Sequence, residues 1–346
     1  MSGRARCWPT AIDLFSGCGA VTEALKRRHF RVVAAVDQDP VACRTFRVNH
    51  PTIELWESDI RQCDPNEVVA QEPDSFDLDL LVVCAPCQPF SSQNSYGGCD
   101  PRSDLIFQGI RFARALHPKV ILFENVPGLA AQRHSRIIAK LEAGLASLDY
   151  EVSGPHDLDA ADYGVPQRRR RFILFASRVD AQVSIPKAVT PPEQRTTVRD
   201  AIGSLPPLKA GQAVPSDALH RARNHSALTL RRLSHIPNDG GSRSSLPDEL
   251  VLPCHRKHDG HPDVLGRMTW DDVAPTLTTG CTDVTKGRFA HPDQDRAISA
   301  REAALLQSFP GSYAFVGSAT EIARQIGNAV PPCFIKELLP AVRAVL

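Results

Sequence analysis

The stretch LLVVCAPCQ, residues 80–88, carries an apolar run that ends at a proline and a cysteine, Pro86 and Cys87. A second run, VILFENVPG over residues 120–128, ends at the acid Glu124. Short, continuous apolar runs are typical of strands that are buried on both faces of a parallel sheet. The carboxyl ends of such strands meet at one edge, where open α/β proteins bind their ligands. The two stretches therefore predict a thiol and a carboxylate at one edge of a parallel sheet.

Strand and helix patterns alternate through the first half of the chain. Strands are expected at residues 11–15, 31–36, 78–83, 120–123 and 171–176, and helices at residues 21–28, 40–49, 105–116 and 135–148. This alternation is typical of an α/β fold with a doubly wound, mainly parallel sheet.

The composition changes in the second half of the chain. From residue 185 to about residue 292 the sequence is rich in Pro, Gly, His, Arg and Thr and has little periodicity, which predicts a smaller, irregular domain. We expect a catalytic and cofactor-binding domain at residues 1–178, a recognition domain at residues 179–296, and a C-terminal segment, residues 297–346, that returns to the first domain.

Overall composition indicates an ordinary soluble protein. The 346 residues are 42% hydrophobic and 23% charged, with a formal net charge of +1. There is no run of 18 apolar residues and no signal-peptide pattern, so no membrane segment is expected. The ten cysteines are scattered and several lie in apolar strands, which favours reduced thiols and a cytoplasmic location.

A local basic excess offers two interpretations. Between Arg195 and Arg267 there are 11 Lys or Arg against 7 Asp or Glu, with six histidines. The segment is either a solvated, loop-rich insertion or a nucleic-acid surface, on which arginines position phosphates and contact guanine edges.

A glycine turn and two acids indicate a nucleotide-type pocket. Gly17 and Gly19 follow the first expected strand and lead into a helix, where backbone can approach a ligand closely. Asp37 ends the second strand, where such folds place an acid for ribose hydroxyls. Asp59 ends the third unit and is either an adenine contact or a helix cap. The missing third glycine favours an adenosine cofactor without a pyrophosphate over NAD.

The spacing Cys84-Ala85-Pro86-Cys87 also fits a redox pair or half of a zinc site. No second C-x-x-C is present, and the chain is far longer than a redox domain. His255, His258 and His261 near Cys254 are better explained as a surface loop than as ligands. No metal site is expected, and a nucleophile is the better account of Cys87.

Four consecutive arginines precede the last strand of the first half. Such a run is ordinarily a solvated basic patch. Strand alternation, however, sends Arg169 and Arg171 to one face and Arg168 and Arg170 to the other. One pair can therefore face the pocket and hold an electron-rich oxygen or orient a carboxylate.

Taken together, these residues resemble the cytosine-C5 DNA methyltransferase family, of the bacterial restriction-modification type. Eight motifs occur in the family's order: DLFSGCGAVTEAL (13–25), VDQDP (36–40), ESDIR (57–61), CAPCQPFS (84–91), FENVPGL (123–129), YGVPQRRRRFIL (163–174), REAALLQSFP (301–310) and QIGNAVPP (325–332). They cover residues 13–332 apart from the variable insertion, in which APTLT (274–278) resembles part of a target-recognition domain.

The resemblance implies a fold, a reaction and a set of roles. The fold would be that of class I S-adenosylmethionine-dependent methyltransferases. Cys87 would attack C6 of a flipped-out cytosine while Glu124 holds N3 and the exocyclic amine. Arg171 would hold O2, with Arg169 in support. The positions that match the family's cofactor-binding residues are Phe15, Gly17, Gly19, Asp37, Gln38, Asp59, Ile60, Pro86 and Asn328.

The resemblance also implies partners. The substrate would be double-stranded DNA, with Ser91, Gln93, Arg102 and Thr276 as contacts. Loop residues 88–104 would close over the flipped base. We expect a monomer in the bacterial cytoplasm, associated with the nucleoid through DNA, and a cognate restriction endonuclease that acts on the same site.

The sequence departs from the family's pattern at two positions and leaves two rival functions open. Cys84 stands where glycine or proline is usual, so a second thiol could make the site sensitive to oxidation, and Ala20 replaces a usual glycine. One rival substrate is tRNA, although the Cys-Phe-Thr tripeptide of that branch is not evident. The other rival is a non-catalytic nucleic-acid-binding homologue.

Overall fold

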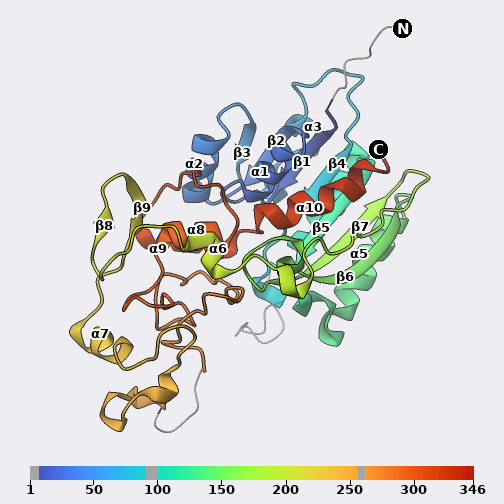
Figure 1. Ribbon diagram of the computed structural model, residues 1–346. Helices are drawn as coiled ribbons and strands as arrows, with labels where there is room; N and C mark the ends of the chain where they lie inside the picture. The colour runs from blue at the N-terminus through green and yellow to red at the C-terminus, as the bar shows by residue number, and fades with distance from the viewer. Residues whose placement is uncertain (1–7, 91–99, 101, 256–261) are drawn as a thin grey trace. The chain divides into compact units, whose positions relative to one another are not determined.

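The structure is a computed structural model that describes residues 8–90, 100, 102–255 and 262–346. The chain divides into two compact units (Figure 1). The first contains the described residues up to Asp159, together with Arg170–Ala188 and Pro332–Leu346, and the second contains Ala160–Arg169 and Val189–Pro331.

The first unit is built on a seven-stranded sheet. Its strands are β1 (Thr10–Leu14), β2 (Arg31–Asp37), β3 (Glu54–Glu57), β4 (Leu80–Val83), β5 (Val120–Asn125), β6 (Glu151–Asp159) and β7 (Arg170–Ser177). They lie in the order β3-β2-β1-β4-β5-β7-β6. The strands from β3 to β5 in that order pair in parallel, whereas β7 is antiparallel to both of its neighbours. The mainly parallel sheet predicted from the sequence is confirmed.

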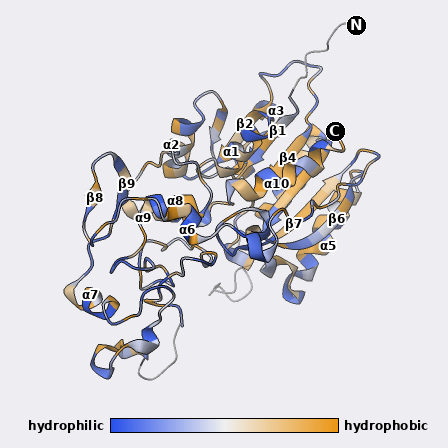
Figure 2. Cartoon of the chain, viewed as in Figure 1, coloured by the Kyte–Doolittle hydropathy of each residue, from blue (hydrophilic) through white to orange (hydrophobic). Residues whose placement is uncertain are grey.

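Helices bury the sheet on both faces. The helices of this unit are α1 (Ala20–Arg27), α2 (Pro40–Asn49), α3 (Pro65–Val68), α4 (Gln108–Leu116), α5 (Ser135–Ala146) and α10 (Pro332–Arg343). Leu81 and Val83 of β4 share a hydrophobic cluster with Phe112 of α4 and Leu141 of α5. Leu80 and Val82 point to the opposite face and are fully buried as well. Burial on both faces explains the continuous apolar runs, which Figure 2 shows in the central strands.

The last helix lies against the first. Arg28, which follows α1, donates a hydrogen bond of 2.9 Å to the carbonyl oxygen of Lys336 and forms an ion pair of 2.7 Å with Glu337. The end of the chain therefore completes the first unit.

The second unit has little regular structure. Its elements are α6 (Val198–Ile202), β8 (Ala213–Val214), β9 (Asp217–Arg221), α7 (Ala227–Leu233), α8 (Ala300–Leu306) and α9 (Ala319–Asn328), with several short 3-10 turns. A small hydrophobic cluster includes Leu233, Leu265 and Val284. Most of the intervening chain is loop, as its Pro- and Gly-rich composition predicts.

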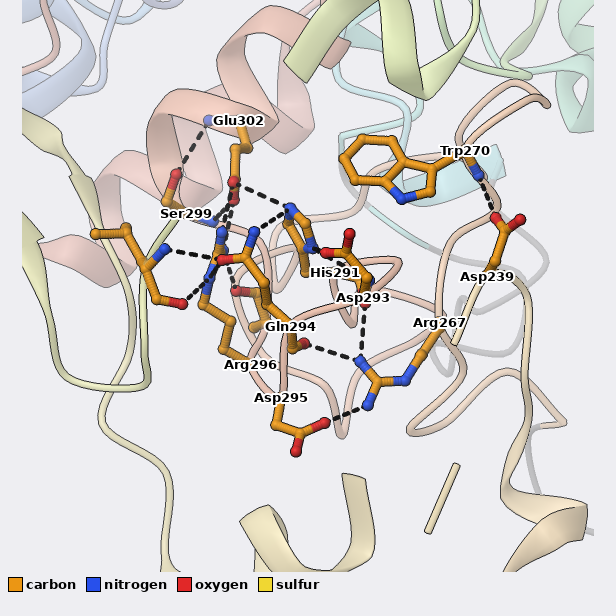
Figure 3. Close-up of polar contacts among 12 residues, drawn as sticks. Asp239, Arg267, Trp270, His291, Asp293, Gln294, Asp295, Arg296, Ser299 and Glu302 are labelled. Atoms are coloured by element: carbon orange, nitrogen blue, oxygen red, sulfur yellow. Dashed lines mark hydrogen bonds and ion pairs between the residues drawn. The ribbon is translucent and has the colours of Figure 1, made fainter. Parts of the chain in front are cut away.

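Two buried arginines stabilise these loops (Figure 3). Arg296 is fully buried and forms a two-pronged ion pair with Glu302, with both N–O distances at 2.7 Å. Arg267 is equally buried and donates to four backbone carbonyl groups, those of Leu233, Ile236, His291 and Gln294. Loops leave many carbonyl groups without ladder partners, and guanidinium groups supply the missing donors.

The unit boundaries differ from the domain boundaries expected from the sequence. Residues 160–169 belong to the second unit although they lie inside the expected catalytic domain, and only residues 332–346 of the expected C-terminal segment belong to the first unit. The assignment of catalysis to residues 1–178 and of recognition to residues 179–296 stays a prediction. No helix in the described part of the chain is both long and apolar enough to cross a bilayer.

Candidate active site

Strand register gathers the predicted residues of the first unit at one edge of the sheet. Val83 of β4 lies between Leu14 of β1 and Phe123 of β5, and Leu14 also pairs with Val36 of β2. The next residue along each strand therefore reaches the same edge: Phe15, Asp37, Cys84 and Glu124. Cys87 follows Cys84 in a half-buried turn. The predicted meeting of thiol and carboxylate strands is confirmed.

A buried ion pair orients the carboxylate at this edge. Nε of Arg171 lies 2.7 Å from Oε1 of Glu124, and both side chains are less than a tenth exposed. Arg171 reaches Glu124 because β7 runs antiparallel to β5, which places Asn125 opposite Phe172. The neighbouring Arg170 faces solvent and pairs with Asp157. The predicted alternation of the arginines thus holds for these two residues.

The turn that carries Cys87 is attached to the end of β5 by two close contacts. The side-chain amide of Asn125 donates a hydrogen bond of 3.1 Å to the carbonyl oxygen of Ala85. Gly128 lies so close to the backbone of Phe90 that a Cβ atom there would be 2.0 Å from the Phe90 oxygen. The glycine of FENVPGL therefore permits a close approach that no other residue permits.

Cys84 lies at the edge but is chemically unlike a nucleophile. Desolvation raises the pKa of its thiol well above the usual value, and the nearby Glu124 and Asp13 carboxylates raise it further. A protonated thiol is a poor nucleophile and oxidises slowly. Cys84 and Cys87 are not joined in a disulfide. This environment disfavours the thiolate form of Cys84, and sensitivity of the site to oxidation stays a prediction.

The glycine turn after β1 is held by a carboxylate. Phe15, Gly17 and Gly19 have φ values of 62°, 53° and 93°, so three residues in five adopt the left-handed region that favours glycine. Oδ2 of Asp37 accepts a hydrogen bond of 2.8 Å from the Gly17 N–H, and Oδ1 accepts one from Asp39. Desolvation raises the pKa of Asp37, although these N–H donors oppose the shift.

Asp59 adopts the helix-cap arrangement. Its carboxylate accepts from the backbone N–H of Arg61, 3.0 Å away, and begins the 3-10 turn Ile60–Gln62. The Arg61 guanidinium pairs with the same carboxylate at 2.6 Å and holds its pKa below the usual range. An adenine contact by Asp59 stays a prediction, as do contacts by Ile60, which is buried, Gln38, which is exposed, and Pro86, which is half-buried.

Three predicted residues belong to the second unit. Arg169 is buried and donates hydrogen bonds of 2.9 Å to the Leu277 carbonyl and 2.8 Å to the Gly327 carbonyl. Thr276 is exposed, and its hydroxyl donates to the Arg168 carbonyl at 2.7 Å. Asn328 is exposed at the end of α9. Arg169 also donates to the side-chain oxygen of Gln167 at 3.3 Å, and its supporting role in catalysis stays a prediction.

The predicted DNA contacts of the 88–104 loop are described only at its end. Ser91 and Gln93 lie outside the described residues, as does most of the loop. Arg102 is described and pairs with Asp100 at 2.6 Å.

Asp13 is fully buried and was not among the residues predicted to form the site. Its Oδ2 accepts a hydrogen bond of 2.7 Å from the Thr22 hydroxyl. Thr22 lies in the first turn of α1, whose N-cap residue Gly19 has no side chain, so Asp13 ties the start of this helix to the preceding strand. Asp13 is the first residue of the motif DLFSGCG, and this position in the sequence could have identified it as part of the site.

Gln167 and Gln307 were missed as well. Both are fully buried, and Nε2 of Gln167 donates to Gln307, which in turn donates to the Ile326 and Ala329 carbonyls. These hydrogen bonds connect the motifs YGVPQRRRRFIL, REAALLQSFP and QIGNAVPP within the second unit. Their partners are too distant in sequence for a local pattern to reveal.

Comparisons with known proteins find a family model and relatives that match nearly the whole chain. The family model of the C-5 cytosine-specific DNA methylases matches residues 10–343. The Type II methylase M.HgiDII of Herpetosiphon aurantiacus is 38% identical over 343 residues, which cover 97% of this chain and 95% of that protein. The Type II methyltransferase M1.HphI of Haemophilus parahaemolyticus is 31% identical over 96% of this chain and 86% of that protein.

Solved structures show the same fold. A protein encoded within an E. coli prophage superposes with a TM-score of 0.77 at 24% identity and covers 97% of this chain and 99% of that one. The Entamoeba histolytica methyltransferase EhMeth superposes with a TM-score of 0.66 at 16% identity, over 97% and 98% of the two chains.

Proposed function

This chain belongs to the C-5 cytosine-specific DNA methylase family and is a DNA cytosine-C5 methyltransferase, and we propose that it acts through a covalent bond between Cys87 and C6 of a flipped-out cytosine. The observation that carries the proposal is the buried Glu124–Arg171 pair, one strand away from the turn that bears Cys87.

The arrangement suits activation of a cytosine ring. C6 is a poor electrophile until N3 receives a proton or a strong hydrogen bond, and Glu124 is the acid at hand. Arg171 fixes the orientation of Glu124 and offers further N–H donors for O2 of the base. Attack by the Cys87 thiolate then forms the S–C6 bond and moves the electron pair to C5. Loss of the C5 proton after methyl transfer re-forms the C5–C6 double bond and expels the thiolate.

S-adenosylmethionine fits the turn after β1. The turn exposes backbone at a helix N-terminus, and Asp37 at the end of β2 stands where ribose hydroxyls are bound in such folds. We infer that Phe15, Gly17, Gly19, Asp37, Gln38, Asp59, Ile60, Pro86 and Asn328 hold it. When bound, it supplies a methyl group on a sulfonium, which the electron-rich C5 accepts. The family and the fold of this chain support S-adenosylmethionine as the cofactor.

The substrate we propose is a specific sequence in double-stranded DNA. C6 is inaccessible in a stacked duplex, so the base must leave the helix, at a cost of a few kcal/mol. Ser91, Gln93, Arg102 and Thr276 are the proposed contacts. The Type II names of the relatives support a cognate restriction endonuclease that recognises the same site. We also propose that the enzyme is a monomer in the bacterial cytoplasm.

Trapping on a mechanism-based substrate tests the proposal. DNA with 5-fluorocytosine at the target should form a covalent adduct that requires S-adenosylmethionine, because fluorine cannot leave C5 as a proton does. Cys87→Ala should form none, and Cys84→Ala should form the wild-type amount. An adduct with tRNA but not with DNA would replace the DNA proposal. No adduct with either would remove the covalent mechanism.

A further inference from the structure

His50 lies directly behind the glycine turn, although no motif of the sequence analysis includes it. It follows α2 as the C-cap residue and is 1% exposed. Nε2 lies 3.2 Å from the carbonyl oxygen of Gly19, and Nδ1 lies 3.2 Å from Nζ of Lys26 on α1. The ring of Phe46 meets the imidazole edge-on at 5.0 Å between centroids.

These partners fix the tautomer of the ring. The Lys26 ammonium group can only donate, so Nδ1 must accept. The Gly19 carbonyl can only accept, so Nε2 must carry the proton. The imidazole is therefore neutral and donates to Gly19. Burial and the Lys26 charge agree with this, because they lower the pKa of His50 to about 4.

The hydrogen bond acts on the end of a turn that costs energy to order. Gly19 begins α1 with a φ of 93°, and its carbonyl also accepts the first helical N–H, that of Glu23 at 2.9 Å. The start of the turn is held by Asp37 through the Gly17 N–H. His50 is the corresponding side chain at the other end. A turn held at both ends loses less conformational freedom when a ligand binds to it.

We propose that His50 is a positioning residue for the cofactor, holding the Gly17–Gly19 turn in its binding conformation through the Gly19 carbonyl. This inference rests on the proposed function, which assigns the turn to S-adenosylmethionine. His50 would act without contacting the cofactor, through the turn that binds it.

Two conservative variants separate this role from simple core packing. In His50→Gln, the side-chain amide reaches the position of Nε2 and can donate to Gly19. In His50→Asn, the shorter amide reaches only the position of Nδ1 and can serve Lys26 but not Gly19. Both replace a ring by an amide, so a residue that merely fills space should respond similarly to the two changes.

The measurement is the dissociation constant of S-adenosylmethionine for the full chain, by titration calorimetry without DNA. We expect His50→Asn and His50→Ala to bind about tenfold more weakly than wild type, the typical effect of one lost hydrogen bond. His50→Gln should stay within about threefold. At saturating S-adenosylmethionine, kcat and the KM for DNA should change by less than about threefold in all three, because Cys87 and Glu124 are not displaced. Should His50→Ala fail to fold, the comparison of Gln with Asn decides alone.

Each outcome is informative. Equal cofactor binding by wild type, His50→Asn and His50→Gln would overturn the inference while leaving the proposed function intact. Equal weakening in Gln and Asn would show that the ring acts by packing, which also overturns it. Failure of the wild-type protein to bind S-adenosylmethionine would instead overturn the proposed function, on which the inference rests.

Discussion

Among the individual side chains, Arg171 and Glu124 form a buried pair whose loss should affect both stability and rate. Replacing Arg171 by Ala leaves a buried carboxylate without the guanidinium that balances it, which should lower the free energy of unfolding by about 3–5 kcal/mol. The kcat should fall as well, because Glu124 loses its orientation. Urea unfolding and steady-state kinetics measure the two effects.

The adjacent arginine is a matched control. Arg170 pairs with Asp157 at the surface, where both side chains are at least 40% exposed. Arg170→Ala should cost less than about 1 kcal/mol. A similar decrease in the free energy of unfolding of both variants would show that burial does not make the Glu124–Arg171 pair more important for stability than a surface pair.

The two thiols of the C-x-x-C spacing should differ in reactivity. Because the pKa of Cys84 is well above its usual value, iodoacetamide at pH 8 should alkylate Cys87 well before Cys84, with the sites distinguished by peptide mass spectrometry. The variant Cys84→Ala should keep its activity and its resistance to mild peroxide. Preferential alkylation of Cys84 would contradict the environment described for it.

At the scale of elements, the close approach of the turn after β5 to the Cys87 turn is the contact most easily tested. Gly128→Ala would place a methyl group 2.0 Å from the Phe90 oxygen, so one of the two turns must move. A displacement of about 1 Å at a reacting group can cost about 100-fold in rate, and we expect such a loss in kcat. Gly311→Ala is the control, since no atom lies within 4 Å of the added Cβ. Unchanged kcat in Gly128→Ala would show that the approach is irrelevant to the placement of Cys87.

Five of the seven strands and the edge where the parallel ones end could be predicted from the sequence, because apolar runs and turn residues are local signals. Strands β3 and β6 were not expected, because neither contains a fully buried residue and their apolar pattern is weak. Because Cys87, Glu124 and the Gly17–Gly19 turn lie at or just beyond the ends of those strands, their location at this edge could be predicted as well. The partners of the side chains could not be predicted in the same way. Arg169 binds the carbonyls of Leu277 and Gly327, which only the folded chain brings near. Asp59 could have been assigned to Arg61, two residues away, but a carboxylate beside an arginine has many arrangements.

For the whole molecule, buried histidines predict a stability that depends on pH. The pKa values of His50 in the first unit and His291 in the second are both lowered to about 4. In unfolded chains these groups take up protons below about pH 6.5, whereas in the folded protein they do not until about pH 4. As pH falls across this range, each histidine therefore lowers the free energy of unfolding, by about 3 kcal/mol per histidine.

Asp13 has the opposite effect. Its pKa is raised to about 7, so the stability that its protonated form contributes is complete below about pH 4 and is lost as pH rises through 7. In the first unit the effects of Asp13 and His50 oppose each other between pH 4 and pH 6.5. In the second unit Glu302, whose pKa is lowered, adds to the loss of stability in acid that His291 causes.

The second unit should therefore be the more acid-sensitive. Hydrogen exchange by mass spectrometry at pH 7.5 and pH 5, corrected for intrinsic rates, should show a larger loss of protection in α8 than in β4. His291→Gln should reduce that loss, and Asp13→Asn should make the first unit more acid-sensitive than in wild type. A greater loss of protection in β4 than in α8 would contradict the balance of charges described here.

The arginines inside the second unit have a consequence for how its loops tolerate substitution. Arg267 donates to four main-chain carbonyls, and Arg296 donates to those of Leu208 and Ala297 besides its pair with Glu302. Every residue type carries a carbonyl. Such a scaffold is indifferent to the side chains that its loops display. Loop surfaces can then drift, recombine or be randomised in a library without loss of the frame that supports them. We propose that loop libraries on this frame would yield enzymes that methylate new sequences, because the recognition domain expected at residues 179–296 lies largely within this unit.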